Sequence, residues 1–167
     1  MFRLFKDLKV YFTNRPRYEQ WKRYEKLQKE YRKKLVKQAK EFCPWSGWYM
    51  NEMVKTMLEF YNKTYTAGDC CWSEETRVQK IAGQVKEALE YADKLEKLDD
   101  MECSAMIPLA EEYADEFEAY CAEVDSRVDC GGYSLKYRGY IAYEFLEKKY
   151  TETLYTIIGK HIWEWCD

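Results

Sequence analysis

The chain has 167 residues, of which 47% are hydrophobic and 17% aromatic, and its formal net charge is −3. A chain of this length can bury a core without disulfides or metals, and its apolar content excludes a disordered protein. Seven Gly and three Pro are too few for an all-β fold with many tight turns. No run of about 18 apolar residues is present, so no transmembrane helix is expected.

The charge is distributed unevenly along the chain. Residues 1–41 carry 14 Lys and Arg against 5 Asp and Glu, whereas 86–125 carry 3 basic and 14 acidic residues. The net charges of these two stretches are therefore +9 and −11. We predict one domain, 1–167, with a basic N-terminal helical segment over 1–41 and an acidic helical body over 42–167.

The first predicted element is a short amphipathic helix over 1–12, with its apolar residues on one side. Charges inside this segment, and the lack of a small-residue cleavage site, argue against a secretory signal. The stretch "TNRP" at 13–16 combines an N-cap signal with an early proline, so a second helix is expected over about 16–42. Its apolar residues recur every three or four positions, which predicts one buried face.

Four further helices are predicted over about 47–67, 74–98, 105–125 and 135–165. The helix over 47–67 is apolar over a wide arc and is expected to be the most buried. Between it and the next helix, "TAGDCCWSEE" reads as a loop, because Gly68 suits a helix C-terminus and Ser73 an N-cap. The start of the last helix is open, because "YSLKY" at 133–137 alternates with period two.

These elements predict an all-α fold, a bundle of about four long helices plus the short N-terminal amphipathic helix. Its core is expected to contain Leu58, Phe60, Val85, Phe117, Leu146 and Leu154.

The sequence predicts no metal or cofactor site and no catalytic residue. None of the seven cysteines forms the C-x2–4-C spacing of a zinc site or the C-x-x-C spacing of a thioredoxin-type site, so reduced thiols are expected.

The single histidine, His161, is preceded three residues earlier by Ile158, which excludes the paired Glu-x-x-His motifs of a di-iron bundle. We expect His161 to be partly buried against aromatic residues. Phosphate-binding glycine motifs are also missing. A non-enzymatic role is favoured.

The strongest functional signal is the basic helix over 15–41, where Lys and Arg alternate with aromatic residues. This pattern fits nucleic-acid binding, but it also fits a solvated amphipathic helix whose aromatics face its own core, and their one-sided spacing favours the second interpretation. We predict that this helix contacts a protein partner. Self-association through the acidic stretch 86–125 and nucleic-acid association remain alternatives, as does membrane-surface docking of 1–12. The candidate partner-binding residues are Trp21, Lys29, Arg32, Lys33 and Lys37.

One long segment, "WYMNEMVKTMLEFYNKTYTAGDCCWSEETRVQKIAGQVKEALEYADKLE", resembles a segment of small uncharacterised helical proteins encoded by tailed bacteriophages. The shared features are an aromatic-rich helix, a short loop, an E-x-R helix start, an A-L-x-x-A helix and an aromatic tail, here "HIWEWCD". The resemblance covers 45–98 and 140–167. It implies a phage protein acting in the cytoplasm of an infected bacterium or in a virion, as an adaptor or as an inhibitor of a host protein, including a defence protein. It implies no activity and no catalytic residue.

Overall fold

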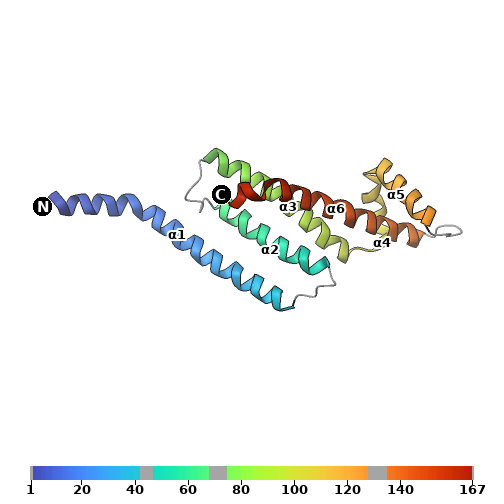
Figure 1. The fold of residues 1–167 in the computed structure, drawn as a ribbon, viewed down its shortest axis with the longest axis horizontal. Helices are drawn as coiled ribbons and strands as arrows, with labels where there is room; N and C mark the ends of the chain where they lie inside the picture. Colours follow the sequence, from blue (N-terminus) through green and yellow to red (C-terminus); the bar gives the residue numbers. More distant parts are fainter. Residues whose placement is uncertain (1, 42–46, 68–74, 128–134, 167) are drawn as a thin grey trace. The chain divides into compact units, whose positions relative to one another are not determined.

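The computed structural model describes the backbone of residues 2–41, 47–67, 75–127 and 135–166, and the side chains within 17–41, 47–67, 75–125 and 137–165 except that of Trp48. These residues form six helices and no strand (Figure 1). The helices are α1 Phe2–Glu41, α2 Gly47–Thr66, α3 Glu75–Asp100, α4 Cys103–Glu111, α5 Ala114–Arg127 and α6 Leu135–Cys166. The prediction of an all-α fold is therefore confirmed for the described residues.

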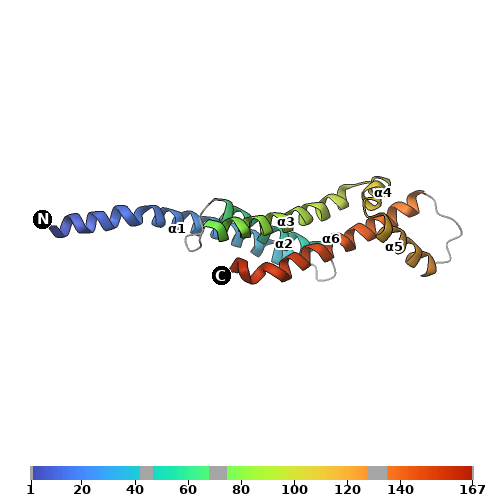
Figure 2. The same cartoon turned by 90° about the horizontal axis from the view of Figure 1, so that it is seen from above.

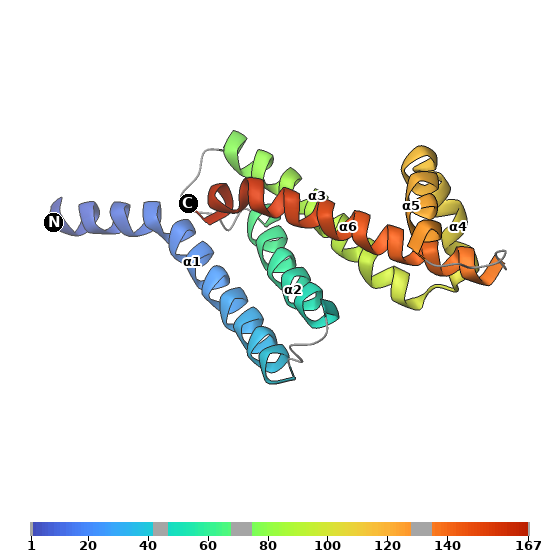
Figure 3. The same ribbon diagram turned by 45° about the vertical axis from the view of Figure 1, so that its right-hand side comes forward.

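The N-terminal region is one helix where the sequence predicted two. α1 is continuous over 40 residues, so the predicted break at 13–16 is wrong. Pro16 lacks an N–H and crowds the preceding turn, but a proline inside a helix can bend it without ending it. α1 does change direction between its N-terminal and C-terminal halves (Figure 3).

The helix predicted over 105–125 is instead two helices, α4 and α5, separated at 112–113. The backbone N–H of Tyr113 bonds to the carbonyl of Ala110 at 2.9 Å, which closes α4 with a tight turn. The break places Tyr113 beside Phe145 of α6, where Phe117 and Tyr120 of α5 also pack. Ring centroids in this cluster lie 5.3–6.1 Å from that of Phe145, so packing of aromatic rings accounts for the change in direction. The N-terminal end of α6 is helical from Leu135 onward.

The chain divides into two compact units, Met1–Leu89 with His161–Asp167, and Glu90–Lys160. The division falls inside α3 and α6, so each of these helices contributes to both units. The single domain over 1–167 stays a prediction.

In the first unit, α1 and α2 lie side by side and run in opposite directions (Figures 1 and 3). The N-terminal half of α1 projects beyond the end of α2 (Figure 2). α2 also packs on the last turn of α6, where the Tyr65 hydroxyl donates a hydrogen bond to the backbone carbonyl of Trp165 at 2.5 Å. The core of this unit includes Leu58, Ile81 and Val85.

Five of the six predicted core residues are buried, with 2% or less of their surface exposed: Leu58, Val85, Phe117, Leu146 and Leu154. The sixth, Phe60, is only half-buried, because it lies at the edge between α1 and α2. α2 was expected to be the most buried helix, but α6 supplies more of the fully buried residues, and Met50 and Met57 of α2 are 46% and 39% exposed.

Truncating one core leucine in each unit should destabilise the protein. Leu58→Ala and Leu154→Ala should each lower the free energy of unfolding by about 2–5 kcal/mol, because each removes buried methyl groups and leaves a cavity. Urea denaturation followed by far-ultraviolet circular dichroism measures this change. Tyr140→Ala is the control, because Tyr140 is 51% exposed, and its effect should stay within about 0.5 kcal/mol. Unchanged midpoints for both leucine variants would contradict the placement of these helices.

Two glycines of α6 make a matched pair. A Cβ atom added at Gly139 would lie 2.6 Å from the carbonyl oxygen of Cys103, whereas one added at Gly159 would meet nothing within 4 Å. Gly139→Ala should therefore cost about 1–3 kcal/mol through overpacking against rigid backbone. Gly159→Ala should stabilise by up to about 1 kcal/mol through its higher helix propensity. Thermal melts of both variants test this difference in sign, and equal shifts would show that α4 and α6 are not in close contact.

Candidate functional site

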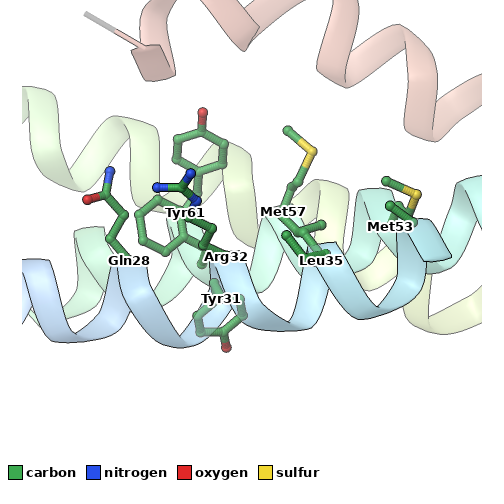
Figure 4. Close-up of a pocket in the computed structure, with 10 residues that line it drawn as sticks. Gln28, Tyr31, Arg32, Leu35, Met53, Met57 and Tyr61 are labelled. Atoms are coloured by element: carbon green, nitrogen blue, oxygen red, sulfur yellow. The ribbon is translucent and has the colours of Figure 1, made fainter.

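A groove lies between α1 and α2 of the first unit, with a volume of about 560 Å³ and a largely apolar lining (Figure 4). α1 contributes alternating polar and apolar side chains, and α2 contributes methionines and aromatic rings. The residues that line it are Gln28, Tyr31, Arg32, Leu35, Val36, Ala39, Met53, Met57, Phe60 and Tyr61. We refer to these residues as the α1–α2 groove.

Helical periodicity explains why these residues meet. Gln28, Arg32, Leu35 and Ala39 follow one another at four, three and four positions, which places them on one face of α1. Met53, Met57 and the pair Phe60–Tyr61 repeat the same spacing on α2. Two helices that run side by side therefore present their matching faces to one channel. Figure 4 shows Gln28 and Arg32 directed to the same side as Tyr61 and Met57, away from the ring of Tyr31.

Tyr31 fixes the spacing of the two helices. Its side chain is 2% exposed, its ring centroid lies 5.7 Å from that of Phe60, and its hydroxyl donates a hydrogen bond to Glu59 Oε2 at 3.3 Å. The ammonium groups of Lys34 and Lys63 lie 4.5 Å and 5.1 Å from its ring centroid. A hydrogen bond with Tyr31 raises the pKa of Lys63, so this lysine remains charged beside the ring.

Nearer the C-terminus of α1, a second side-chain hydrogen bond joins α1 to α2. Gln38 Nε2 donates to Thr56 Oγ1 at 2.8 Å. Thr56 is 7% exposed, so this bond replaces hydration that the buried hydroxyl has lost. Tyr31 and Gln38 therefore both join α1 to α2 through side-chain hydrogen bonds, and Tyr31 also lines the groove.

The five candidate residues predicted from the sequence are all exposed on α1. Arg32 lines the groove. Lys29 and Lys33 flank Arg32 on the side of α1 turned away from α2, whereas Lys37 lies toward the back of the helix, away from the groove. Trp21 lies about three turns before Arg32 on the same face, and its ring is 6.1 Å from that of Tyr24. We define the basic rim as Lys29 and Arg32, because Lys33 lies about 100° around α1 from Arg32.

The apolar part of the groove was not predicted from the sequence. Val36 is 48% exposed and Met57 is 39% exposed. The available signal was a second apolar stripe on α2, formed by Met50, Met53, Met57 and Tyr61, beside the stripe of Leu58 and Tyr65 that enters the core. One apolar stripe is enough to pack a helix against a core, so a second stripe indicates a second contact surface.

A polar cluster joins α3 to the last turn of α6 within the first unit. The indole N–H of Trp165 donates to Gln84 Oε1 at 3.2 Å, and Gln84 Nε2 lies 3.1 Å from His161 Nδ1 and 3.2 Å from Glu164 Oε2. Lys80 Nζ also lies 3.0 Å from Glu164 Oε2.

The Trp165 contact fixes the orientation of the Gln84 amide. An indole nitrogen can only donate, so Gln84 must direct its oxygen to Trp165 and its amide N–H groups to His161 and Glu164. An amide N–H of Gln84 is therefore directed at His161 Nδ1. His161 is thus partly buried and engaged in a structural network at the chain's C-terminal end.

The described side chains include no group of three or more His, Cys, Asp and Glu residues that could hold a metal ion. Cys103 and Cys121 are free thiols, and burial raises the pKa of Cys121, which lowers its reactivity. The side chains of the other five cysteines lie outside the described residues, as do the predicted C-terminal glycine Gly68 and the predicted N-cap Ser73.

In the second unit, the carboxyl group of Glu147 and the hydroxyl of Tyr143 are shifted by their surroundings. Burial, with repulsion from Asp99, raises the pKa of Glu147. Burial and a hydrogen bond to Asp99 raise the pKa of Tyr143 to about 12. The Tyr143 hydroxyl donates to Asp99 Oδ1 at 3.0 Å, so this tyrosine stays protonated and serves to join α6 to α3.

No protein-family model, no curated protein and no solved structure matches the chain. Within the described residues, none of the helices combines the length and apolar content needed to cross a membrane.

Acid should loosen the polar cluster at the C-terminal end. Hydrogen bonds from Lys80 and Gln84 lower the pKa of Glu164 below its ordinary value of 4.5. Because the folded-state pKa is lowered, the stabilisation is complete above pH 4.5 and is lost as the pH falls through the lowered value. The Trp165 indole N–H resonance, followed by NMR, should report this transition.

Glu164→Gln should abolish the transition, because the amide does not titrate. Glu87→Gln, on the exposed face of α3, should leave it unchanged. A transition that persists in Glu164→Gln would assign the pH response to another group.

Proposed function

We propose that the chain is a non-enzymatic protein-binding module and that its contact surface is the α1–α2 groove with the basic rim. The observation that carries this proposal is an apolar groove whose lining side chains Val36 and Met57 remain 48% and 39% exposed. Contiguous exposed apolar side chains rimmed by polar ones are typical of interaction surfaces.

The composition of the groove agrees with this role. Met, aromatic residues and Arg are enriched in protein interfaces, and unbranched methionines adapt to the shape of a partner. Met53, Met57, Phe60, Tyr61 and Arg32 supply these residue types together. The groove lacks convergent titratable groups, since Arg32 is its only charged lining residue, and a reaction would need such groups.

The biological setting of the proposal comes from the resemblance to phage proteins over 45–98 and 140–167. In that setting the module is an adaptor or an inhibitor of a host protein, including a defence protein, and it acts in the cytoplasm of an infected bacterium or in a virion.

The second candidate function is nucleic-acid association through the basic helix. It is favoured by Tyr18 and Trp21, which are 58% and 43% exposed, since exposed rings beside cations can stack on bases. Lys22 Nζ lies 4.6 Å from the centroid of the Tyr18 ring. Against it, the other aromatic residues of this helix, Tyr24 and Tyr31, pack on Phe60 of α2.

Site-specific photocrosslinking in the cells that naturally produce the chain separates the two functions. A benzophenone amino acid at Val36 or Met57 should yield the same protein adduct, because both positions lie in the groove. The same group at Glu87, on the exposed face of α3, should not. Adding Arg32→Glu should reduce the adduct.

At Tyr18 the crosslinker tests the alternative. A nuclease-sensitive adduct there, without a protein adduct at Val36 or Met57, would favour nucleic-acid association and contradict the protein-binding proposal.

A further inference from the structure

We infer that the partner segment is an acidic amphipathic α-helix that lies along the α1–α2 groove, with its apolar face on Val36 and Met57 and its acidic flank on the basic rim. This inference rests on the proposed protein-binding function and specifies the chemistry of the partner.

The dimensions of the groove fit two to three turns of a helix. Its lining extends from Gln28 to Ala39 on α1 and from Met53 to Tyr61 on α2. At about 1.5 Å per residue these stretches span about 12–16 Å, and one helical turn advances about 5.4 Å. A partner helix would therefore place about three apolar residues in the groove, at i, i+3 or i+4, and i+7.

The surroundings of the groove exclude other occupants. Strand addition requires a sheet edge with unpaired backbone groups, and the described residues contain only helices. A small molecule is usually buried over most of its surface, whereas this groove has lining side chains as exposed as Val36 at 48%. A helix requires only complementary side chains, and it would complete a three-helix layer with α1 and α2.

The charge on the two walls predicts the charge of the partner. Over 17–41, α1 carries 10 Lys and Arg against 4 Asp and Glu, a net charge of +6. α2 carries two basic and two acidic residues and is neutral. The net positive charge therefore lies on α1, so a bound helix should carry Glu or Asp along the flank that meets α1, in addition to its apolar stripe.

A second copy of the chain does not meet both requirements. Two copies related by a two-fold axis through the groove would bring their basic rims together, and like charges oppose such pairing. Among the described side chains of the acidic helix α5, at 114–125, every exposed one is Asp, Glu or Ala, whereas Phe117 is fully buried and Tyr120 and Val124 are half-buried. The chain's own acidic helix thus has the charge but lacks an exposed apolar stripe.

The test uses the full chain and a fluorescent synthetic peptide of about 16 residues, with Leu on one helical face and Glu, Gln and Ala elsewhere. Two control peptides have the same composition in shuffled order, or Lys in place of Glu. Fluorescence anisotropy should show saturable binding of the first peptide and weaker binding of both controls. In the complex, the ¹³C-methyl NMR signals of Met53 and Met57 should shift, whereas that of Met106, which is 1% exposed, should not.

Matched variants test the apolar and the charged parts separately. Met57→Glu should weaken binding of the acidic peptide about 30-fold, as expected for a central interface anchor. Val36→Glu is the second variant, because it is more exposed and less able to disturb folding. The double variant Lys29→Glu, Arg32→Glu changes the rim, and the double variant Lys26→Glu, Lys37→Glu is its control. The rim variant should weaken binding of the acidic peptide about tenfold more than the control does. The second pair makes the same change in net charge on the far side of α1.

Several outcomes would overturn the inference. Equal binding of the shuffled or lysine peptide would show that neither the stripe nor the acidic charge is recognised. Equal loss in the two charge-reversal pairs would show that the rim has no local role. Dimers of the native chain in sedimentation, lost in Met57→Glu, would assign the groove to a second copy. If photocrosslinking at Val36 and Met57 still gives a protein adduct while the acidic peptide fails to bind, the proposed function stands and the helical acidic partner is wrong.

Discussion

The packing of Tyr31 between α1 and α2 is the contact on which the candidate site depends. A tyrosine ring is large enough to hold two helices apart at a fixed spacing, and its hydroxyl needs a polar partner when the ring is buried. Glu59 provides that partner, and Phe60 covers the ring. Tyr31 and Phe60 also line the groove, so the contact that joins the two helices forms part of the candidate binding surface.

The sequence predicted the helices well because their apolar residues follow a regular period and their breaks contain Gly, Pro and Cys-rich stretches. Two helix boundaries were predicted wrongly, one because a residue has two possible effects and one because the sequence carries no signal for it. Pro16 can start a helix or bend one, and only the continuous α1 distinguishes these outcomes. The break at 112–113 has no Gly or Pro, and its cause is the packing of Tyr113, Phe117 and Tyr120 around Phe145, which is invisible in a linear pattern.

The site was predicted in part for a similar reason. Lys29 and Arg32 are recognisable from charge alone, because a basic run on one helix is local in sequence. Met53 and Met57 belong to another helix, and whether an apolar stripe is covered depends on neighbours that periodicity does not identify. The Gln84 cluster is harder still, since its amide joins residues about 80 positions away and glutamine on a helix surface carries no signal by itself.

The projecting half of α1 has a consequence for kinetics. Beyond the end of α2 this half carries further positive charge, since residues 2–16 contain four Lys and Arg and one Asp. An acidic partner would experience the positive electrostatic potential of this segment before it reaches the groove. Such attraction raises the rate of association more than it raises the lifetime of the complex. With a screening length of about 8 Å at physiological ionic strength, salt should slow association strongly. The residence time would instead be set by the methionines and Val36, so the two rate constants would respond to separate parts of one helix hairpin.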